Sequence, residues 1–260
     1  MQEARKRGMK VVLDLVVNHT SDRHPWFQEA RSDPGSPRRD WYVWSKSRPR
    51  NMKQGMVFPG YQDSTWSRDS KARKYYYHRF FEFMPDLNAT HPAVREEIRR
   101  IMGYWLELGV MGFRIDAVPF LLEVADPKKA NWKTDFQFLY DLRRFLQLRV
   151  GDGVLLGEAN VPPPAQEKYF GPSGNGLHMI FNFWVNQHLF YSLATADTAP
   201  LAAALRATRN CPSTAQWAHF LRNHDELDLG RLTPEQRATV FEAFAPDESM
   251  QLYGRRIPRR

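Results

Sequence analysis

Short apolar runs that end in polar or charged residues recur along the chain. Near-continuous apolar runs of this kind are typical of parallel strands that are buried on both faces of a sheet. Stretches with helical periodicity separate most of them, and Thr90 precedes the first as a candidate N-cap. The runs cover residues 10–19, 110–116, 154–158, 177–182 and 217–225, and the helical stretches cover 92–108, 134–150, 185–206 and 233–245. This alternation predicts an α/β fold with a parallel sheet.

The polar residues that end these runs are the first candidates for function. His19, Asp116, Glu158 and Asp225 each stand at the end of a different run. In (β/α)8 barrels, active sites are built where the strands meet the loops that follow them. The chain's 260 residues are also near the usual length of such a barrel. We therefore expect these four side chains at the rim of a barrel.

Residues 20–90 interrupt the alternation. They contain four tryptophans and the run Tyr75–His78, scattered among Pro, Gly, Asp and Ser, without a clear helical period. We predict a small irregular domain over residues 21–89, inserted after the first visible strand, with the barrel formed by residues 1–20 and 90–260. The aromatic rings either form the core of this insertion or stack on sugar rings, and the sequence favours the first alternative.

Composition narrows the class of protein. A chain with 42% hydrophobic and 25% charged residues is an ordinary globular protein. It contains no apolar run long enough for a transmembrane helix and no signal-peptide pattern, and its single cysteine excludes a disulfide framework, so we expect a cytoplasmic protein. Residues 1–10 carry +3 and residues 251–260 carry +4 of the net charge of +8, which leaves +1 for the rest. This distribution argues against nucleic-acid binding, which needs a basic docking face.

The carboxylates have contrasting surroundings. Arg114 and Asp116 are two residues apart on a predicted strand and face the same side, so the guanidinium favours the ionised carboxylate, as a nucleophile requires. Glu158 follows Leu-Leu-Gly, an apolar approach that suits a general acid. Such a pair is the requirement for cleaving a glycosidic bond. Asp225 adds a third carboxylate that could stabilise positive charge at the reacting carbon.

Five segments, in order along the chain, resemble the conserved segments of the α-amylase family, glycoside hydrolase family 13. They are Asp14–His19, Met84–Asn88, Gly112–Asp116, Gly157–Ala159 and Asn223–Asp225. The resemblance implies a retaining α-glucoside enzyme with Asp116 as nucleophile, Glu158 as acid/base and Asp225 as transition-state stabiliser. His19, Arg114, Asn223, His224 and Glu226 would bind hydroxyl groups of the substrate.

Further segments are similar to the trehalose synthase branch of this family. They are residues 14–21, 39–44, 116–122 and 220–231. This similarity implies an isomerase, or glucosyltransferase, that interconverts maltose and trehalose. Two alternatives stay open: an α-glucosidase or oligo-1,6-glucosidase that transfers the glucosyl group to water, and an inactive remnant that needs a partner chain.

The resemblance also implies a calcium ion and an incomplete barrel. Asn18 and Asp86 supply hard oxygens where barrel and insertion meet, and by resemblance Glu123 and the main-chain carbonyls of Phe120 and Leu121 complete the shell. No organic cofactor is expected. The visible strands resemble strands 3 to 7 of the family's (β/α)8 barrel, so we expect a partial barrel with an exposed sheet edge. The expected partners are maltose, trehalose or other α-glucosides and either a second copy or a complementing chain, but no nucleic acid and no membrane.

Overall fold

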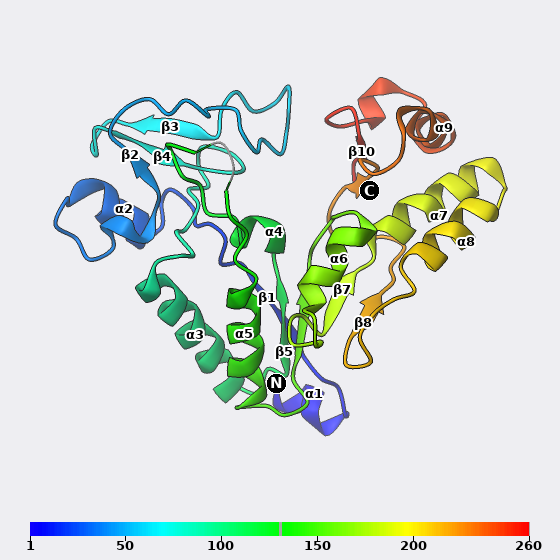
Figure 1. Cartoon of the computed structure of the whole chain (residues 1–260), viewed down its shortest axis with the longest axis horizontal. Coiled ribbons are helices and arrows are strands. Elements are labelled where there is room, and N and C mark those ends of the chain that lie inside the picture. The colour runs from blue at the N-terminus through cyan, green and yellow to red at the C-terminus, as the bar shows by residue number, and fades with distance from the viewer. Residues whose placement is uncertain (130–131, 260) are drawn as a thin grey trace. The chain divides into compact units, whose positions relative to one another are not determined.

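The computed structural model describes residues 1–129 and 132–259, which divide into two compact units, Met1–Leu155 and Leu156–Arg260 (Figure 1). The first unit contains α1 (Gln2–Lys6), β1 (Val12–Leu15), α2 (Pro25–Ser32), η1 (Arg39–Trp41), β2 (Trp44–Ser45), β3 (Trp66–Asp69), β4 (Lys74–Tyr77), α3 (Pro92–Glu107), β5 (Gly112–Ile115), α4 (Val118–Leu121) and α5 (Gln137–Gln147). Strand β6 (Val154–Gly157) begins in the first unit and ends in the second.

The second unit continues with elements of the same two kinds. They are α6 (Pro163–Phe170), β7 (Met179–Phe181), α7 (Phe183–Thr195), α8 (Ala199–Ala207), β8 (Gln216–Ala218), β9 (Leu227–Asp228), α9 (Pro234–Phe244), η2 (Glu248–Met250) and β10 (Arg256–Ile257). Helices α7 and α8 lie side by side (Figure 1).

The predicted parallel strands are present in both units. In the first, β1 pairs in parallel with β5, so that Asp14 lies beside Arg114. At the start of β6, the amide of Val154 donates to the carbonyl of Met111, the residue before β5, at 3.1 Å. In the second, β6 pairs with β7 and β7 pairs with β8, again in parallel. All four residues of β5 are buried, as the continuous apolar pattern requires. The prediction of an α/β fold with a parallel sheet is therefore confirmed.

Strand β1 lies at the edge of the sheet. Val12 and Val16 are 44% and 51% exposed there, although valine is usually buried. The sequence predicted an exposed edge of this kind.

The segment 21–89 contains more regular structure than its sequence predicts. It holds helix α2 and a three-stranded antiparallel sheet with the order β2-β4-β3. Trp66 and Tyr77 are 1% exposed and form part of a core cluster together with Val43. The aromatic residues thus pack largely against one another, which is the first of the two alternatives. The boundaries predicted for an inserted domain remain a prediction.

Three predicted helical stretches differ from the structure in their caps, their continuity or their ends. The ring of His91, and not Thr90, caps α3 by accepting from the amide of Ala93, because Pro92 occupies the first helical position and the Thr90 hydroxyl donates to Asn88 Oδ1. Residues 185–206 form two helices because Ala196 adopts a left-handed conformation, with φ of 54°. Helix α5 is three residues shorter at each end than the predicted stretch.

The C-terminal region differs from its prediction in two ways. Strand β8 ends at Ala218, so residues 219–226 form a loop, and Asp225 does not end that strand. Asn186 Nδ2 donates to the carbonyls of Phe220 and Leu221 and so takes acceptors that a continued strand would use. The basic segment at residues 255–259, where no strand was expected, contributes β10, which pairs antiparallel with β9. Within the described residues, no helix has the length and apolar character needed to cross a membrane.

Candidate functional site

Asp116 directly follows β5 and is held by the neighbouring strand. Its amide donates to Leu15 O at 3.2 Å, and Arg114 Nη1 lies 2.5 Å from Asp116 Oδ1. The same guanidinium nitrogen lies 3.1 Å from Asp14 Oδ1. Arg114 is buried and the Asp116 side chain is 21% exposed, so solvent screens this contact less than the contact with Asp14, whose side chain is 57% exposed. The close approach of Arg114 and Asp116 is the arrangement that their spacing predicts.

The residue after Asp116 has an unusual backbone conformation that the sequence did not indicate. Ala117 is left-handed, with φ of 46°, and precedes α4 as its N-cap residue. A non-glycine residue in this region carries strain, and such strain is concentrated at functional sites. The sharp turn lets α4 begin at Val118, with only Ala117 between the helix and the candidate nucleophile.

His19 lies near Asp116, in surroundings that disfavour protonation of its ring. Burial lowers the pKa of His19, while the negative charge of Asp116 acts in the opposite direction and is the weaker influence. Asn18 Nδ2 is 3.3 Å from His19 Nδ1, and the ring of Phe80 packs edge-on against the imidazole at 5.2 Å. A neutral imidazole in this position can exchange hydrogen bonds with a sugar hydroxyl group.

The candidate calcium ligands Asn18 and Asp86 are in contact. Residues 18–20 pair with residues 85–87 through the His19–Asp86 bridge, and Asn18 Nδ2 donates to Asp86 Oδ2 at 3.4 Å. Asp86 is 4% exposed, and burial raises its pKa to about 7. The amide of Arg79 donates to Asp86 Oδ1 at 2.8 Å. A buried carboxylate whose charge is so poorly compensated is suited to a cation.

Glu123 follows α4 and reaches the same region through Arg79. Its Oε2 lies 3.4 Å from Arg79 Nη2, and Thr134 Oγ1 donates to its Oε1 at 3.4 Å. The Arg79 guanidinium stacks on the rings of Phe120 and Trp132 at 4.6 and 4.9 Å. Sequence reasoning missed Arg79, for which the adjoining aromatic run and His78 were the available signal. Among the residues that the structure describes, no three His, Cys, Asp or Glu side chains form a metal-binding group, but a shell with amide and main-chain oxygens needs only two carboxylates.

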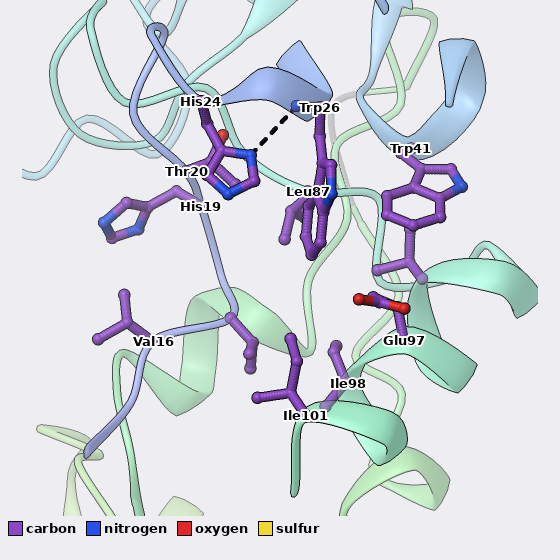
Figure 2. A pocket seen from close by; sticks show the side chains of 12 residues that line it. Val16, His19, Thr20, His24, Trp26, Trp41, Leu87, Glu97, Ile98 and Ile101 are labelled. Carbon is purple, nitrogen blue, oxygen red and sulfur yellow. Dashed lines mark hydrogen bonds between the residues drawn. The ribbon is translucent and has the colours of Figure 1, made fainter. Parts of the chain in front are cut away.

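A separate cavity of ≈180 Å³ lies beside the end of β1 (Figure 2). The rings of Trp26 and Trp41 line it, and helix α3 contributes Glu97, Ile98 and Ile101. Its lining includes His19, but Arg114 and Asp116 do not belong to it.

In the second unit, Glu158 directly follows β6. The strand leads into it through the buried residues Leu155 and Gly157, and the residue after it, Ala159, is fully buried. Asn160 then accepts from Arg231 at both its carbonyl and its side-chain oxygen. The amide of Arg231 donates to Gln187 Oε1 at 2.7 Å. These contacts, which the sequence did not indicate, join the loop after Glu158 to the segment that follows β9.

Asp225 lies in the loop between β8 and β9. Its amide donates to Asn223 Oδ1 at 3.0 Å, and its Oδ2 lies 3.3 Å from His224 Nε2. The side chains of Asp225 and His224 are 42% and 60% exposed, and Glu226 forms an ion pair with Arg256 at 3.5 Å. The structure thus brings Asn223, His224 and Asp225 together, whereas it engages Glu226 with the C-terminal segment.

Comparisons with known proteins agree on one family. The model of the family described as "Alpha amylase, catalytic domain" matches residues 1–244. The trehalose synthase of Thermus thermophilus is 44% identical over 97% of this chain, and the trehalose synthase/amylase of Mycolicibacterium smegmatis is 39% identical over 96%. The chain spans 26% and 43% of the lengths of these two relatives.

Solved structures give the same result. The α-amylase from H. orenii superimposes with a TM-score of 0.72 and 28% identity, covering 95% of this chain and 46% of the other. The isomaltulose synthase from Klebsiella sp. LX3 also has a TM-score of 0.72, with 26% identity over 86% of this chain and 44% of the other.

Proposed function

Because the chain belongs to the family of the α-amylase catalytic domain, we propose that it is a retaining α-glucoside enzyme that interconverts maltose and trehalose. The observation that carries the proposal is the Arg114–Asp116 pair, at 2.5 Å, on the residues that resemble the family's nucleophile segment. The identity to trehalose synthases supports an intramolecular glucosyl transfer over other reactions of the family.

The first half-reaction forms a covalent glucosyl-enzyme. An Asp116 carboxylate oxygen attacks C1 of the non-reducing glucose of maltose, and Glu158 donates its proton to the glycosidic oxygen. The bond from C1 to that oxygen breaks, and glucose is released with the transferred proton on its hydroxyl. Asp225 stabilises the positive charge that develops at C1. Arg114 holds the Asp116 carboxylate at 2.5 Å and orients it toward C1.

The second half-reaction decides the product. The released glucose turns, and its anomeric hydroxyl gives a proton to Glu158 while its oxygen attacks C1 of the glucosyl-enzyme. The ester bond to Asp116 breaks, the enzyme regains its starting protonation state, and the product is trehalose. If water attacks instead, the product is a second glucose, so the exclusion of water separates the isomerase from the hydrolase.

The substrate-binding side chains are of two kinds. The imidazole of His19 and the guanidinium of Arg114 lie with the candidate nucleophile in the first unit. Asn223 and His224 flank the candidate stabiliser in the second unit, and we assign them, with Glu226, to sugar hydroxyl groups. Donors and acceptors are both present, as recognition of hydroxyl groups requires.

The residues around Asp86 fit a calcium ion. Asp86 is buried with an elevated pKa, and Asn18, Glu123 and the carbonyls of Phe120 and Leu121 offer further hard oxygens. When bound, the ion would supply positive charge that stabilises the ionised form of Asp86 and fixes the contact between residues 18–20 and 85–87. It takes no part in bond cleavage in this proposal.

Hydrolysis is the second candidate function. The combined name of the M. smegmatis relative, trehalose synthase/amylase, favours it as a reaction of the same site. The two functions share every step up to the glucosyl-enzyme and differ only in the group that attacks it.

Incubation of the chain with maltose labelled with ¹³C at both anomeric carbons tests the proposal. NMR should show that the anomeric signal of trehalose increases with time in the parent chain. The same signal should be absent with Asp116→Asn and with Glu158→Gln. Glucose without trehalose would support the hydrolase. A chain that consumes neither maltose nor an activated aryl α-glucoside would contradict both functions.

A further inference from the structure

The C-terminal arginines form a strap over the loop that carries Asp225. We define the arginine strap as residues 252–259, all within the second unit. It begins with a tight turn in which Tyr253 and Gly254 are left-handed, with φ of 55° and 61°, and the amide of Arg255 donates to Leu252 O at 3.1 Å. Two successive positive φ angles are the signature of a hairpin turn whose twist matches that of paired strands. The guanidinium of Arg256 stacks over the ring of Tyr253 at 5.6 Å and covers this turn.

The strap pairs with the strand that immediately follows the candidate catalytic loop. Arg256 and Ile257 lie opposite Asp228 and Leu227, and the amide of Leu229 donates to Arg255 O at 2.8 Å. Ile257 and Leu227 are each 4% exposed and belong to the core cluster that also contains Phe190 and Val240. The strap is therefore packed into the core of the second unit and is not a solvated tail.

Charged side chains then attach the strap on both sides of Asp225. Arg259 Nη1 donates to the carbonyl of His224, the residue before Asp225, at 2.9 Å. Arg256 forms ion pairs with Glu226, the residue after Asp225, at 3.5 Å, and with Asp228 at 3.2 Å. In return, Arg222 Nη2, on the loop, donates to Pro258 O at 3.2 Å.

These contacts matter because the loop lacks regular secondary structure of its own. Residues 219–226 belong to no helix or strand. A carboxylate that stabilises a transition state must be held within about 0.5 Å of its productive position. In this loop, such precision has to come from contacts with neighbouring elements.

We propose that Arg256 and Arg259 are positioning residues, which hold the Asn223–Asp228 segment so that Asp225 is fixed for transition-state stabilisation. The inference rests on the proposed function for the role of Asp225, and it gives the basic C-terminal segment a purpose other than binding a polyanion. In this role, neither arginine needs to contact the substrate. Each acts through the backbone or through Glu226 and Asp228.

A double-mutant cycle on the full chain tests the catalytic part. Misplacement of a catalytic group by about 1 Å can lower a rate by roughly 100-fold. We expect Arg256→Ala and Arg259→Ala to lower kcat for an activated aryl α-glucoside by about 10-fold or more, with KM changed less than about threefold, because the loss falls on the transition state. Arg256→Lys should recover part of the rate. The same substitutions in an Asp225→Asn background should change kcat less than about twofold, because the group that they position is gone. Effects of equal size in both backgrounds would overturn the inference.

Hydrogen exchange tests the strap independently of activity. Amides of residues 223–229 should exchange at least about fivefold faster in Arg256→Ala than in the parent chain, and at the parent rate in Arg209→Ala, a matched loss of an exposed arginine after α8. Unchanged exchange in Arg256→Ala would overturn the strap itself. If exchange rises as expected but the parent chain turns over no α-glucoside, the strap stands, whereas the proposed function and the positioning role fail together.

Discussion

Replacing Gly112 by alanine should disrupt the strand that carries Arg114 and Asp116. A Cβ atom added at Gly112 would lie 2.3 Å from Val154 O and 3.1 Å from Val154 N and C, all of them backbone atoms of β6. Cβ atoms do not approach other heavy atoms closer than 3.0 Å. Raising the shortest of these distances from 2.3 Å to the 3.0 Å limit would require the backbones at Gly112 and Val154 to move apart. The obstacle is a strand, so no flexible side chain can move away to relieve it.

The cost follows from this geometry. Overpacking a well-packed interior typically costs 1–3 kcal/mol, and a clash with backbone belongs at the upper end, so we expect Gly112→Ala to lose about 3 kcal/mol of stability. For a chain of this size, that corresponds to a fall in Tm of roughly 6–12 °C. Since Arg114 and Asp116 lie two and four residues further along, kcat should fall as well.

Thermal and urea unfolding followed by circular dichroism measure the effect. Gly151→Ala is the matched control, because its Cβ would meet no atom within 4 Å and its backbone is not left-handed. That variant should stay within about 1 kcal/mol of the parent chain. If Gly112→Ala were as stable as Gly151→Ala, the close packing of β5 on β6 would be refuted.

Three further predictions concern the Arg114–Asp116 ion pair, the buried His78 and the calcium site. Arg114→Met should lower kcat/KM for an activated aryl α-glucoside by roughly 100-fold, because it removes the charge beside Asp116. Asp14→Asn leaves the contact between Arg114 and Asp116 in place and should lower kcat/KM by less than about fivefold. His78 is buried between Ser67 Oγ and Phe80 O, and burial lowers its pKa below 6.5. As the pH falls, the unfolded chain therefore takes up this proton before the folded chain does, and stability should be lost below pH 6.5. In urea unfolding, His78→Gln should lose less stability between pH 7.5 and 5.5 than the parent chain does. Calcium at about 100 times its Kd should add about 2.7 kcal/mol of stability to the parent chain and little to Asp86→Asn. If the parent chain had the same Tm with calcium as with a chelator, the calcium site would be contradicted.

The sequence predicts most of what is local in this structure. Continuous apolar runs identify the parallel strands, and the spacing of two residues places Arg114 beside Asp116. The helix predicted over residues 233–245 is present as α9, and the structure adds that Thr233 caps it in a capping box with Gln236. The contact of Asn18 with Asp86, 68 residues apart, came from family resemblance and not from periodicity.

Long-range and backbone-specific features could not be predicted. The guanidinium of Arg79 is positioned by Phe120 and Trp132, which are distant in sequence, and no local pattern reports such a contact. Strands β9 and β10 have two residues each, too few to show a period of two. The left-handed Ala196, which divides the helical stretch in two, has a side chain that usually favours a helix.

The conversion of maltose to trehalose is the measurement that tests the central claim most directly. With calcium present, the parent chain should produce the anomeric signal of trehalose from doubly labelled maltose, both halves of the product coming from one substrate molecule. Asp116→Asn should abolish the signal while its circular dichroism spectrum stays unchanged. Trehalose formation that persists in Asp116→Asn would contradict the account, because the glucosyl group would then have no nucleophile in this chain.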